Sequence, residues 1–443
     1  MISYEYRANT GRLKKMTYAN GWTATLTYDR FGRIIGEKWE KGNVVKNEYA
    51  YAYDKAGNLV RSIDKTGLKE YTYTYRDNAV IKLRECNVPV DDDGRITSRI
   101  PVNTIYYTYG NDGQLSKKEY TSTDLTAEYV SGENTSSVTH TRQGAEIDTV
   151  TETRDHLGRV TKREVEAGNY TLSHDYTYHA GAVSEVHTEN NKVPSTPTTN
   201  LVKKVTVGGR TFSYEYDNEE RIVSCVDSYG RNYSYTYDET GKLIREVNNG
   251  TASAYVYDRM GNVTQRGHWD IENNCFIYDD SYINISYSTS KRDRISVIQR
   301  NNGTTSSVNV LEYDTLGNPT KYKNGETLVW EKGRQLVSYG DSSFTYNANG
   351  IRTSKTVPSG VVYNYELEGS KIVKITYGEN VIVPLYDAND SPIGMIYNTT
   401  PYWYVKTVQG DIIAIKDSTG ADIVRYSYNA WGKTRKKPKY YRF

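Results

Sequence analysis

Three histidines that lie close together in the sequence, His174, His179 and His187, are the first candidates for metal ligands. A zinc site needs ligands that converge on one point. Residues two apart on a β-strand share a face, so His174 would lie beside Tyr176 and Tyr178. His179 would point to the opposite face of that strand. We therefore interpret the histidines as solvated strand or turn residues and predict no metal site.

An acidic cluster, Asp91-Asp92-Asp93-Gly94, has enough charge to attract Ca²⁺. A helix-loop-helix calcium site needs oxygen ligands at alternating positions and a glutamate at its far end, and neither is present here. The spacing of Asp91 and Gly94 matches a β-turn instead, because aspartate is favoured at the first turn position and glycine at the fourth. We therefore predict a turn and not an ion site.

Residue patterns for nucleophilic or phosphate chemistry do not occur in the sequence. It contains no Gly-x-Ser-x-Gly, no Walker loop and no His-Glu-x-x-His. The three cysteines, Cys86, Cys225 and Cys275, are far apart and odd in number, which predicts free buried thiols and no disulfide framework. Carboxylates are plentiful, but they recur at turn positions. We therefore predict no catalytic residue, no cofactor site and no enzymatic activity.

The element that would have to position any functional residue is seen in YSYTYDETGKLIREVNNG, residues 233–250. Tyr235 and Tyr237 share one face of a strand. Asp238 and Gly241 have the spacing of a type I turn followed by a left-handed residue, which is a common hairpin connection. Leu243 begins a second strand, and the Asn-Gly pair at 249–250 is a strong hairpin signal. Each unit therefore predicts two strands and two turns.

The unit recurs at intervals of roughly 20–25 residues, and a fixed period of this length is typical of a repeat architecture. Helical periodicity appears nowhere. The predicted fold class is therefore all-β, an array of β-hairpins. Clear copies begin at Tyr4, Tyr28, Tyr53, Tyr109, Tyr214, Tyr257 and Tyr313, and looser copies begin at Tyr346 and Tyr386.

Composition limits both the partners and the shape. The net charge is +2, from 56 basic and 54 acidic residues, so nothing favours a nucleic-acid partner. Tyrosine occurs 44 times and phenylalanine 5 times, and tyrosine suits a surface that is apolar along the ring and wet at the hydroxyl. Aliphatic residues are too few to give many strands a dry face. We therefore expect a single extended sheet with water near both faces, closed into a hollow barrel-like shell that removes strand edges.

The chain divides into five regions by the regularity of its units. Residues 1–119 and 201–380 are regular, whereas 120–200 is degenerate, with a polar loop near 188–200. Residues 381–433 are the most apolar, and 434–443 form a short basic tail. No apolar run approaches the ~18 residues of a membrane span, and no signal peptide opens the sequence.

Several units resemble the YD or RHS repeats of bacterial Rhs and wall-associated proteins and of animal teneurins, namely those at Tyr28, Tyr53, Tyr237, Tyr257 and Tyr313. The stretch YVKTVQGDIIAIKDSTGADIVRYSYNAWGK, Tyr404 to Lys433, is similar to the end of the RHS core in Gram-positive surface proteins. The resemblance covers nearly the whole chain and is weakest at 120–200. It implies repeats that spiral into a large hollow β-shell. In the family, this shell encloses the C-terminal toxin of a polymorphic toxin, which self-cleavage releases near the end of the core.

Three functions remain open. The expected one is a non-enzymatic RHS shell segment of an exported or surface bacterial protein, with a C-terminal toxin as its cargo. The alternative is a cell-surface carbohydrate-binding or adhesion module, as older descriptions of the family have it. Cross-strand ladders explain the tyrosine rows better than a sugar platform does. An enzyme built on a β-propeller or β-helix is the least favoured.

The sequence departs from the family pattern after YNAWGK. In the family a Tyr- and Asp-rich plug and then the toxin follow this motif, whereas ten residues follow it here. We therefore expect an incomplete shell, a piece of a larger secreted or surface protein, without plug or toxin. Such a piece should expose unpaired strand edges and self-associate.

Overall fold

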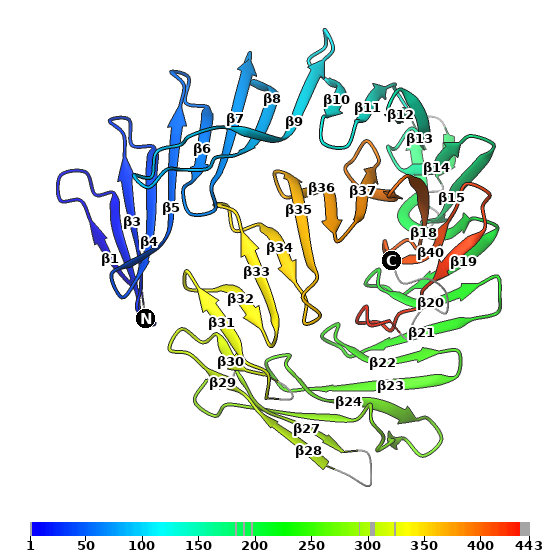
Figure 1. The fold of residues 1–443 in the computed structure, drawn as a ribbon. Helices are drawn as coiled ribbons and strands as arrows, with labels where there is room; N and C mark the ends of the chain where they lie inside the picture. The colour runs from blue at the N-terminus through cyan, green and yellow to red at the C-terminus, as the bar shows by residue number, and fades with distance from the viewer. Residues whose placement is uncertain are drawn as a thin grey trace. The chain divides into compact units, whose positions relative to one another are not determined.

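The computed structural model describes residues 2–181, 184–188, 191–195, 198–291, 293–301, 306–322 and 325–434, with no side chain described within 182–198 or 302–306. These residues form strands and turns and include no α-helix. Accordingly, the described part of the chain offers no helix of the length and apolarity that a membrane crossing requires. The strands follow one another in chain order (Figure 1). The prediction of an all-β array of hairpins is therefore confirmed.

Each turn of the repeat is closed by the residue that opens it. At Asp238, Oδ1 accepts the backbone N–H groups of Thr240 and Lys242, both at 2.9 Å. The N–H of Gly241 donates to the carbonyl of Asp238 at 3.0 Å. Gly241 and Gly261 have φ values of +84° and +89°, which confirms the prediction that these turn positions are left-handed. The same two side-chain bonds close the turns that begin at Asp29, Asp91, Asp155, Asp217, Asp227, Asp258, Asp314, Asn347, Asp387, Asp417 and Asn429.

The tyrosine before each turn attaches its hairpin to the preceding one. The strand register shifts between Val256 and Tyr257, and such a β-bulge re-aims the side chain. The Tyr257 hydroxyl donates to the carbonyl of Leu243 at 2.7 Å, and Leu243 is the aliphatic residue of the preceding unit. The pattern Tyr-Asp-x-x-Gly-x-aliphatic is therefore a series of attachments between units. Equivalent bonds are made by Tyr28, Tyr53, Tyr75, Tyr109, Tyr178, Tyr216, Tyr237, Tyr287, Tyr346 and Tyr428.

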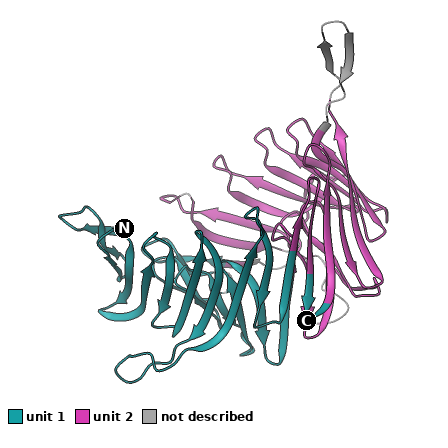
Figure 2. Cartoon of the chain, turned by 90° about the horizontal axis from the view of Figure 1, so that it is seen from above, with its two compact units in different colours: residues 1–128, 140–145, 309–384 teal, residues 129–139, 146–308, 385–443 magenta. Residues whose placement is uncertain are grey.

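The chain forms two compact units, which Figure 2 colours separately. Unit 1 comprises residues 1–128, 140–145 and 309–384, and unit 2 comprises residues 129–139, 146–308 and 385–443. Four strands contain residues of both units, namely β11 (Leu125–Ser131), β12 (Thr135–Arg142), β28 (Ser306–Val310) and β37 (Asn380–Tyr386).

Unit 1 contains two runs of strands that are far apart in sequence, and neighbours within each run pair antiparallel, except that β30 and β31 belong to different sheets. The first run is β1 (Ile2–Tyr6), β2 (Leu13–Tyr18), β3 (Trp22–Tyr28), β4 (Ile34–Lys41), β5 (Val44–Tyr53), β6 (Leu59–Asp64), β7 (Lys69–Arg76), β8 (Ala79–Asn87), β9 (Ile100–Tyr109) and β10 (Leu115–Tyr120). The second run is β29 (Glu312–Tyr313), β30 (Pro319–Lys321), β31 (Leu328–Glu331), β32 (Gln335–Tyr339), β33 (Ser342–Tyr346), β34 (Arg352–Thr356), β35 (Val362–Glu368) and β36 (Lys371–Tyr377).

The second run of unit 1 covers one face of the first. Trp22, Trp39 and Tyr49 form a buried aromatic cluster on β3, β4 and β5. Lys332, from the turn before β32, lies over this cluster, with its Nζ 4.5 Å from the centre of the Tyr49 ring. This face is drier than the composition predicted, because the chain supplies its own second layer and aromatic residues replace the scarce aliphatics.

Unit 2 is built in the same way, from two antiparallel runs. The first run is β13 (Ala145–Arg154), β14 (Val160–Ala167), β15 (Tyr170–Ala180), β18 (Thr198–Val207), β19 (Arg210–Tyr216), β20 (Ile222–Asp227), β21 (Asn232–Tyr237), β22 (Leu243–Asn248), β23 (Thr251–Tyr257), β24 (Val263–Asp270), β25 (Cys275–Phe276), β26 (Ile283–Tyr287) and β27 (Ile295–Asn301). The second run is β38 (Pro392–Tyr397), β39 (Thr400–Lys406), β40 (Ile412–Lys416) and β41 (Asp422–Arg425). A separate hairpin, β16 (Ser184–Thr188) with β17 (Asn191–Ser195), lies where the sequence predicted a polar loop.

Buried polar contacts join the two runs of unit 2. The Trp403 indole N–H donates to Asp148 Oδ2 at 2.7 Å, and both residues are almost fully buried. Arg163 lies between the carboxylates of Glu152 and Asp387, at 2.7 and 3.3 Å. These contacts fix the second run over β13 and β14.

Candidate functional site

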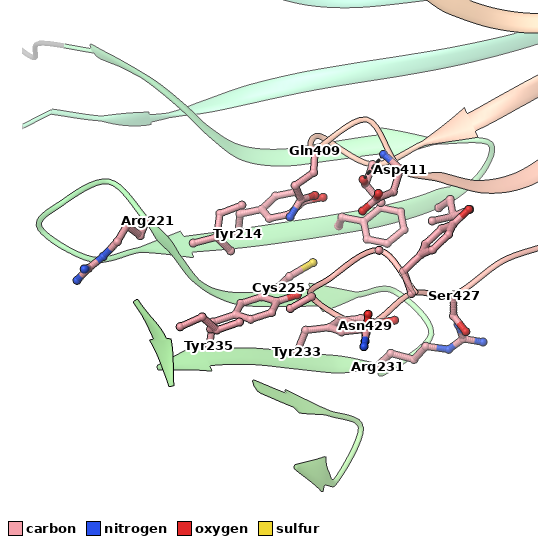
Figure 3. Close-up of a pocket in the computed structure, with 18 of the residues that line it drawn as sticks. Tyr214, Arg221, Cys225, Arg231, Tyr233, Tyr235, Gln409, Asp411, Ser427 and Asn429 are labelled. Atoms are coloured by element: carbon pink, nitrogen blue, oxygen red, sulfur yellow. Dashed lines mark hydrogen bonds between the residues drawn. The ribbon is translucent and has the colours of Figure 1, made fainter. Parts of the chain in front are cut away.

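A cavity of about 640 Å³ lies between the two runs of unit 2 (Figure 3). One wall is formed by β19, β20 and β21. Alternate residues of β19 and β21 face the cavity, because residues two apart share a side of a strand. The other wall is the turn at 407–411, part of β40 and the segment 426–432. Aromatic residues dominate the lining, namely Phe212, Tyr214, Tyr216, Tyr233, Tyr235, Tyr237, Tyr426 and Tyr428.

Three of the lining tyrosines are tied into the repeat. The hydroxyls of Tyr216 and Tyr237 donate to backbone carbonyls at 3.0 Å, and that of Tyr428 does so at 2.8 Å. These rings are held in place by the fold and have no hydroxyl proton to offer a ligand. They form fixed walls.

The hydroxyls of Tyr233, Tyr235 and Tyr426 have no hydrogen-bond partner among the described residues. All three side chains are half-buried and line the cavity. Burial raises the pKa of Tyr235 and of Tyr426. The Tyr235 and Tyr426 hydroxyls therefore remain protonated at neutral pH and can donate to a bound molecule.

Of the residues that the structure describes, three arginines and no lysine line the cavity. Arg210 forms an ion pair with buried Asp227, and the Arg221 Nε lies 2.6 Å from Asp217 Oδ2. Arg231 has no ion-pair partner in the described part of the chain. Figure 3 shows Arg221 and Arg231 at opposite ends of the cavity. The site is thus elongated, with one uncommitted guanidinium at its edge.

The C-terminal wall is anchored by a buried glutamate on β22. Glu246 accepts the backbone N–H of Ala430 at 2.7 Å and the Tyr255 hydroxyl at 3.0 Å. The Trp431 ring meets the Tyr255 ring edge to face, with 5.5 Å between their centres. Asn429 closes the turn by accepting the N–H groups of Trp431 and Lys433. The YNAWGK motif therefore holds one side of the cavity in position.

Comparison with known proteins places these repeats. The RHS Repeat family model matches residues 9–38. The chain is 27% identical over 199 residues to the tRNA3(Ser)-specific nuclease WapA of Bacillus spizizenii, and 28% identical over 200 residues to the tRNA nuclease WapA of Bacillus subtilis strain 168. The chain therefore contains an RHS repeat. Each of these alignments covers 44% of the RHS-repeat chain and 8% of the relative.

Solved structures share the fold of the RHS-repeat chain. The crystal structure of TcdB2-TccC3 without its hypervariable C-terminal region matches with a TM-score of 0.69 at 15% identity, covering 98% of this chain and 24% of that one. The crystal structure of TcdB2-TccC3-TEV matches with a TM-score of 0.65, also at 15% identity, with the same coverage. The RHS-repeat chain thus spans about a quarter of the solved chains and 8% of the curated relatives.

The structure does not bring His174 and His179 together, the two candidate histidines whose side chains it describes. His174 is 5% exposed, so the prediction of a solvated residue is wrong for it, because the second run covers β15. Burial, with the nearby charges of Arg163 and Lys406, lowers the pKa of His174 to about 3. His179 points to the opposite face, and its Nε2 lies 2.9 Å from the carbonyl oxygen of Tyr214. The His187 side chain lies outside the described residues.

The other candidates have structural roles. Asp91 Oδ1 accepts the N–H groups of Asp93 and Arg95, and Gly94 has a φ of +76°, which confirms the predicted turn. All three cysteines are free thiols. Cys86 and Cys225 are buried as predicted, and burial raises the pKa of Cys225 to about 11.

The prediction of a buried thiol is wrong for Cys275, which is exposed on the two-residue strand β25. This strand is too short for other strands to cover its side chains. An exposed position at a hairpin leaves no specific sequence signal.

The cavity itself is not predicted by any sequence pattern. The spacing of Tyr235 and Tyr237 places these two side chains on one face of a strand. The opposite wall comes from residues roughly 170–200 positions further on, such as Gln409 and Tyr426. No local pattern indicates that these two stretches meet.

Proposed function

We propose that this chain is a non-enzymatic wall segment of a bacterial RHS carrier, an exported or surface protein whose C-terminal cargo is a toxin. The main support is the role of the repeated carboxylates. Asp238 accepts two backbone N–H groups, and the hydrogen bonds from Lys242 N–H and the Thr240 side chain hold the pKa of Asp238 below its usual value. A carboxylate held ionised in a turn is a poor general acid.

The relatives support a carrier in which the chemistry resides elsewhere. The matched curated proteins are named as tRNA nucleases, and the RHS-repeat chain corresponds to 8% of their length. One matched solved structure is described as lacking a hypervariable C-terminal region. We infer that a nuclease or another toxic domain would be attached to repeats like these, while the repeats themselves contribute enclosure.

A cargo fusion tests the proposal. A small nuclease domain is joined after residue 443, and its tRNA cleavage is compared with that of an equimolar mixture of the chain and the same nuclease unlinked. Even partial enclosure by this wall segment predicts lower activity for the fusion than for the mixture, with recovery after cleavage at the junction. Equal activity and equal protease sensitivity in both samples would contradict the carrier function.

A carbohydrate-binding or adhesion module is the second candidate, favoured by the free hydroxyls of Tyr233, Tyr235 and Tyr426. Tyrosine rings can stack on sugars, and hydroxyls can bond to them. This candidate predicts retention on cell-wall polysaccharide that Tyr235→Ala abolishes. Retention that is unchanged in Tyr235→Ala, or no retention of the unmodified chain, would count against it.

A further inference from the structure

We propose that the tyrosine-lined cavity of unit 2 is a socket for an extended polypeptide segment, which inserts one aromatic or large aliphatic side chain. This inference rests on the carrier function proposed above, because the segment would belong to the enclosed cargo.

The lining has the composition of a polypeptide interface. Among the described residues that line it, eight are tyrosine or phenylalanine, three are arginine and none is lysine. Tyrosine and arginine are enriched where proteins bind one another, and lysine is depleted there.

The cavity has an apolar floor and a polar edge. Phe212 and Ile413, which are 3% and 8% exposed, supply apolar surface at its base. Arg231, Gln409 and Asp411 are exposed at its edge. This arrangement matches a buried anchor side chain surrounded by a polar rim. A sugar would place several hydroxyls against the floor, where the apolar side chains leave them without partners.

Size and shape agree with a segment and exclude a folded domain. A volume of about 640 Å³ falls within the range of small-ligand sites and accommodates a few residues. The cavity runs between Arg221 and Arg231 (Figure 3). An elongated space suits an extended chain, whose peptide groups need partners along its length.

Partners for those peptide groups are present. The Tyr235 and Tyr426 hydroxyls can donate to peptide carbonyls, as can the uncommitted Arg231 guanidinium. The Asp411 side chain can accept peptide N–H groups at the same edge. None of these contacts depends on the sequence of the peptide beyond its anchor, which suits a carrier of variable cargo.

Binding of defined peptides to the purified 443-residue chain tests the inference. The probe is a fluorescein-labelled peptide with one tryptophan in a Gly-Ser frame, and its control is the same peptide with serine in place of tryptophan. We expect the fluorescence anisotropy of the tryptophan peptide to saturate with a Kd below ~1 mM. The serine control should bind at least tenfold more weakly, and the tryptophan peptide should bind the Arg231→Ala variant at least fivefold more weakly. Arg259→Ala is the matched control variant, because Arg259 is an exposed turn residue of unit 2 that does not line the cavity.

Cross-linking provides a readout that needs no variant. A photo-reactive leucine in place of the tryptophan should attach to peptides from 210–243 and 407–432. Attachment elsewhere, equal binding of the serine control, or equal effects of Arg231→Ala and Arg259→Ala would overturn the inference. Binding of a labelled chitooligosaccharide and not of the peptide would overturn it in favour of the sugar. If the nuclease fusion has reduced activity but the chain binds no peptide, the peptide socket is refuted and the carrier function is not. If the chain binds the peptide but the fusion is fully active, the carrier function is refuted and the peptide socket is not.

Discussion

A single buried carboxylate on β35 should carry much of the attachment between the two runs of unit 1. Glu368 receives the ammonium groups of Lys118 at 2.8 Å and Lys371 at 2.9 Å. It also accepts the hydroxyls of Tyr107 at 3.1 Å and Tyr120 at 2.9 Å. The Glu368 and Lys118 side chains are 12% and 9% exposed, so solvent screens this pair weakly.

The magnitude follows from the acidity of this group. Burial opposes ionisation, but Lys118 and Lys371 outweigh it and lower the pKa of Glu368 from 4.5 to about 2. A shift of this size corresponds to roughly 3 kcal/mol of stability at neutral pH. Glu368→Gln should cost about 3–5 kcal/mol, because it also leaves the Lys118 ammonium buried without its anion.

The effect should depend on pH in a definite direction. Because the folded pKa is depressed, the stabilisation is present above pH 4.5 and is lost as the pH falls toward 2. The difference between wild type and Glu368→Gln should therefore shrink by roughly 2 kcal/mol between pH 7 and pH 3. Hydrogen exchange in rising urea, read by mass spectrometry on peptides from β10 and β35, reports this region separately from unit 2.

The exposed pair of Glu5 and Lys14 provides the control, since solvent screens it and Glu5→Gln should leave the stability almost unchanged. A loss of stability under ~1 kcal/mol for Glu368→Gln at pH 7 would refute the reasoning, because an ordinary exposed ion pair contributes that much. A difference that does not change between pH 7 and pH 3 would also refute it.

Three further predictions concern the repeat itself and are read by denaturant titration. Tyr237→Phe should lower the free energy of unfolding by about 1 kcal/mol, because it removes the hydroxyl that donates to the Ile222 carbonyl. Tyr237→Ala should lower it by about 2–4 kcal/mol. A loss below ~0.5 kcal/mol for the alanine variant would show that the ring is an exposed contact residue. Glu220 has a φ of +63° at the turn position that glycine usually occupies. Glu220→Gly should therefore stabilise the folded chain by about 0.5–1 kcal/mol, and Gly241→Ala should destabilise it by a similar amount. Effects of the opposite sign would contradict the left-handed conformation of these turn positions. Hydrogen bonds lower the pKa of Asp238, so its contribution should be present above pH ~4 and decline in more acidic solution, and an Asp238→Ala variant with unchanged acid sensitivity would be inconsistent with this.

Local turn chemistry was readable from the sequence because each turn contains its own causes. Asp238 and Gly241 belong to one four-residue turn, and no distant residue decides their conformation. The attachment of Tyr257 to Leu243 was not predicted, because it depends on a β-bulge that re-aims the tyrosine. The sequence showed where the tyrosines recur and not where their hydroxyls point.

The sequence pattern could not predict the contacts between runs of strands that are far apart in the chain. Glu246 looks like any polar strand residue until the backbone of Ala430, 184 positions later, is placed against it. His174 was expected in solvent for the same reason, since the layer that buries it comes from the end of the chain. The cavity was not predicted for the same reason. The alternating tyrosines indicated one of its walls in the sequence, whereas no pattern indicated the other.

Purified RHS-repeat chain incubated with tRNA tests the central claim most directly. The chain is predicted to leave tRNA intact at concentrations at which a nuclease of the WapA type degrades it completely, and Asp411→Asn, which alters an exposed carboxylate at the cavity, should behave in the same way as the unmodified chain. Cleavage by the unmodified chain that Asp411→Asn abolishes would contradict the account, because it would place an active site in the wall itself.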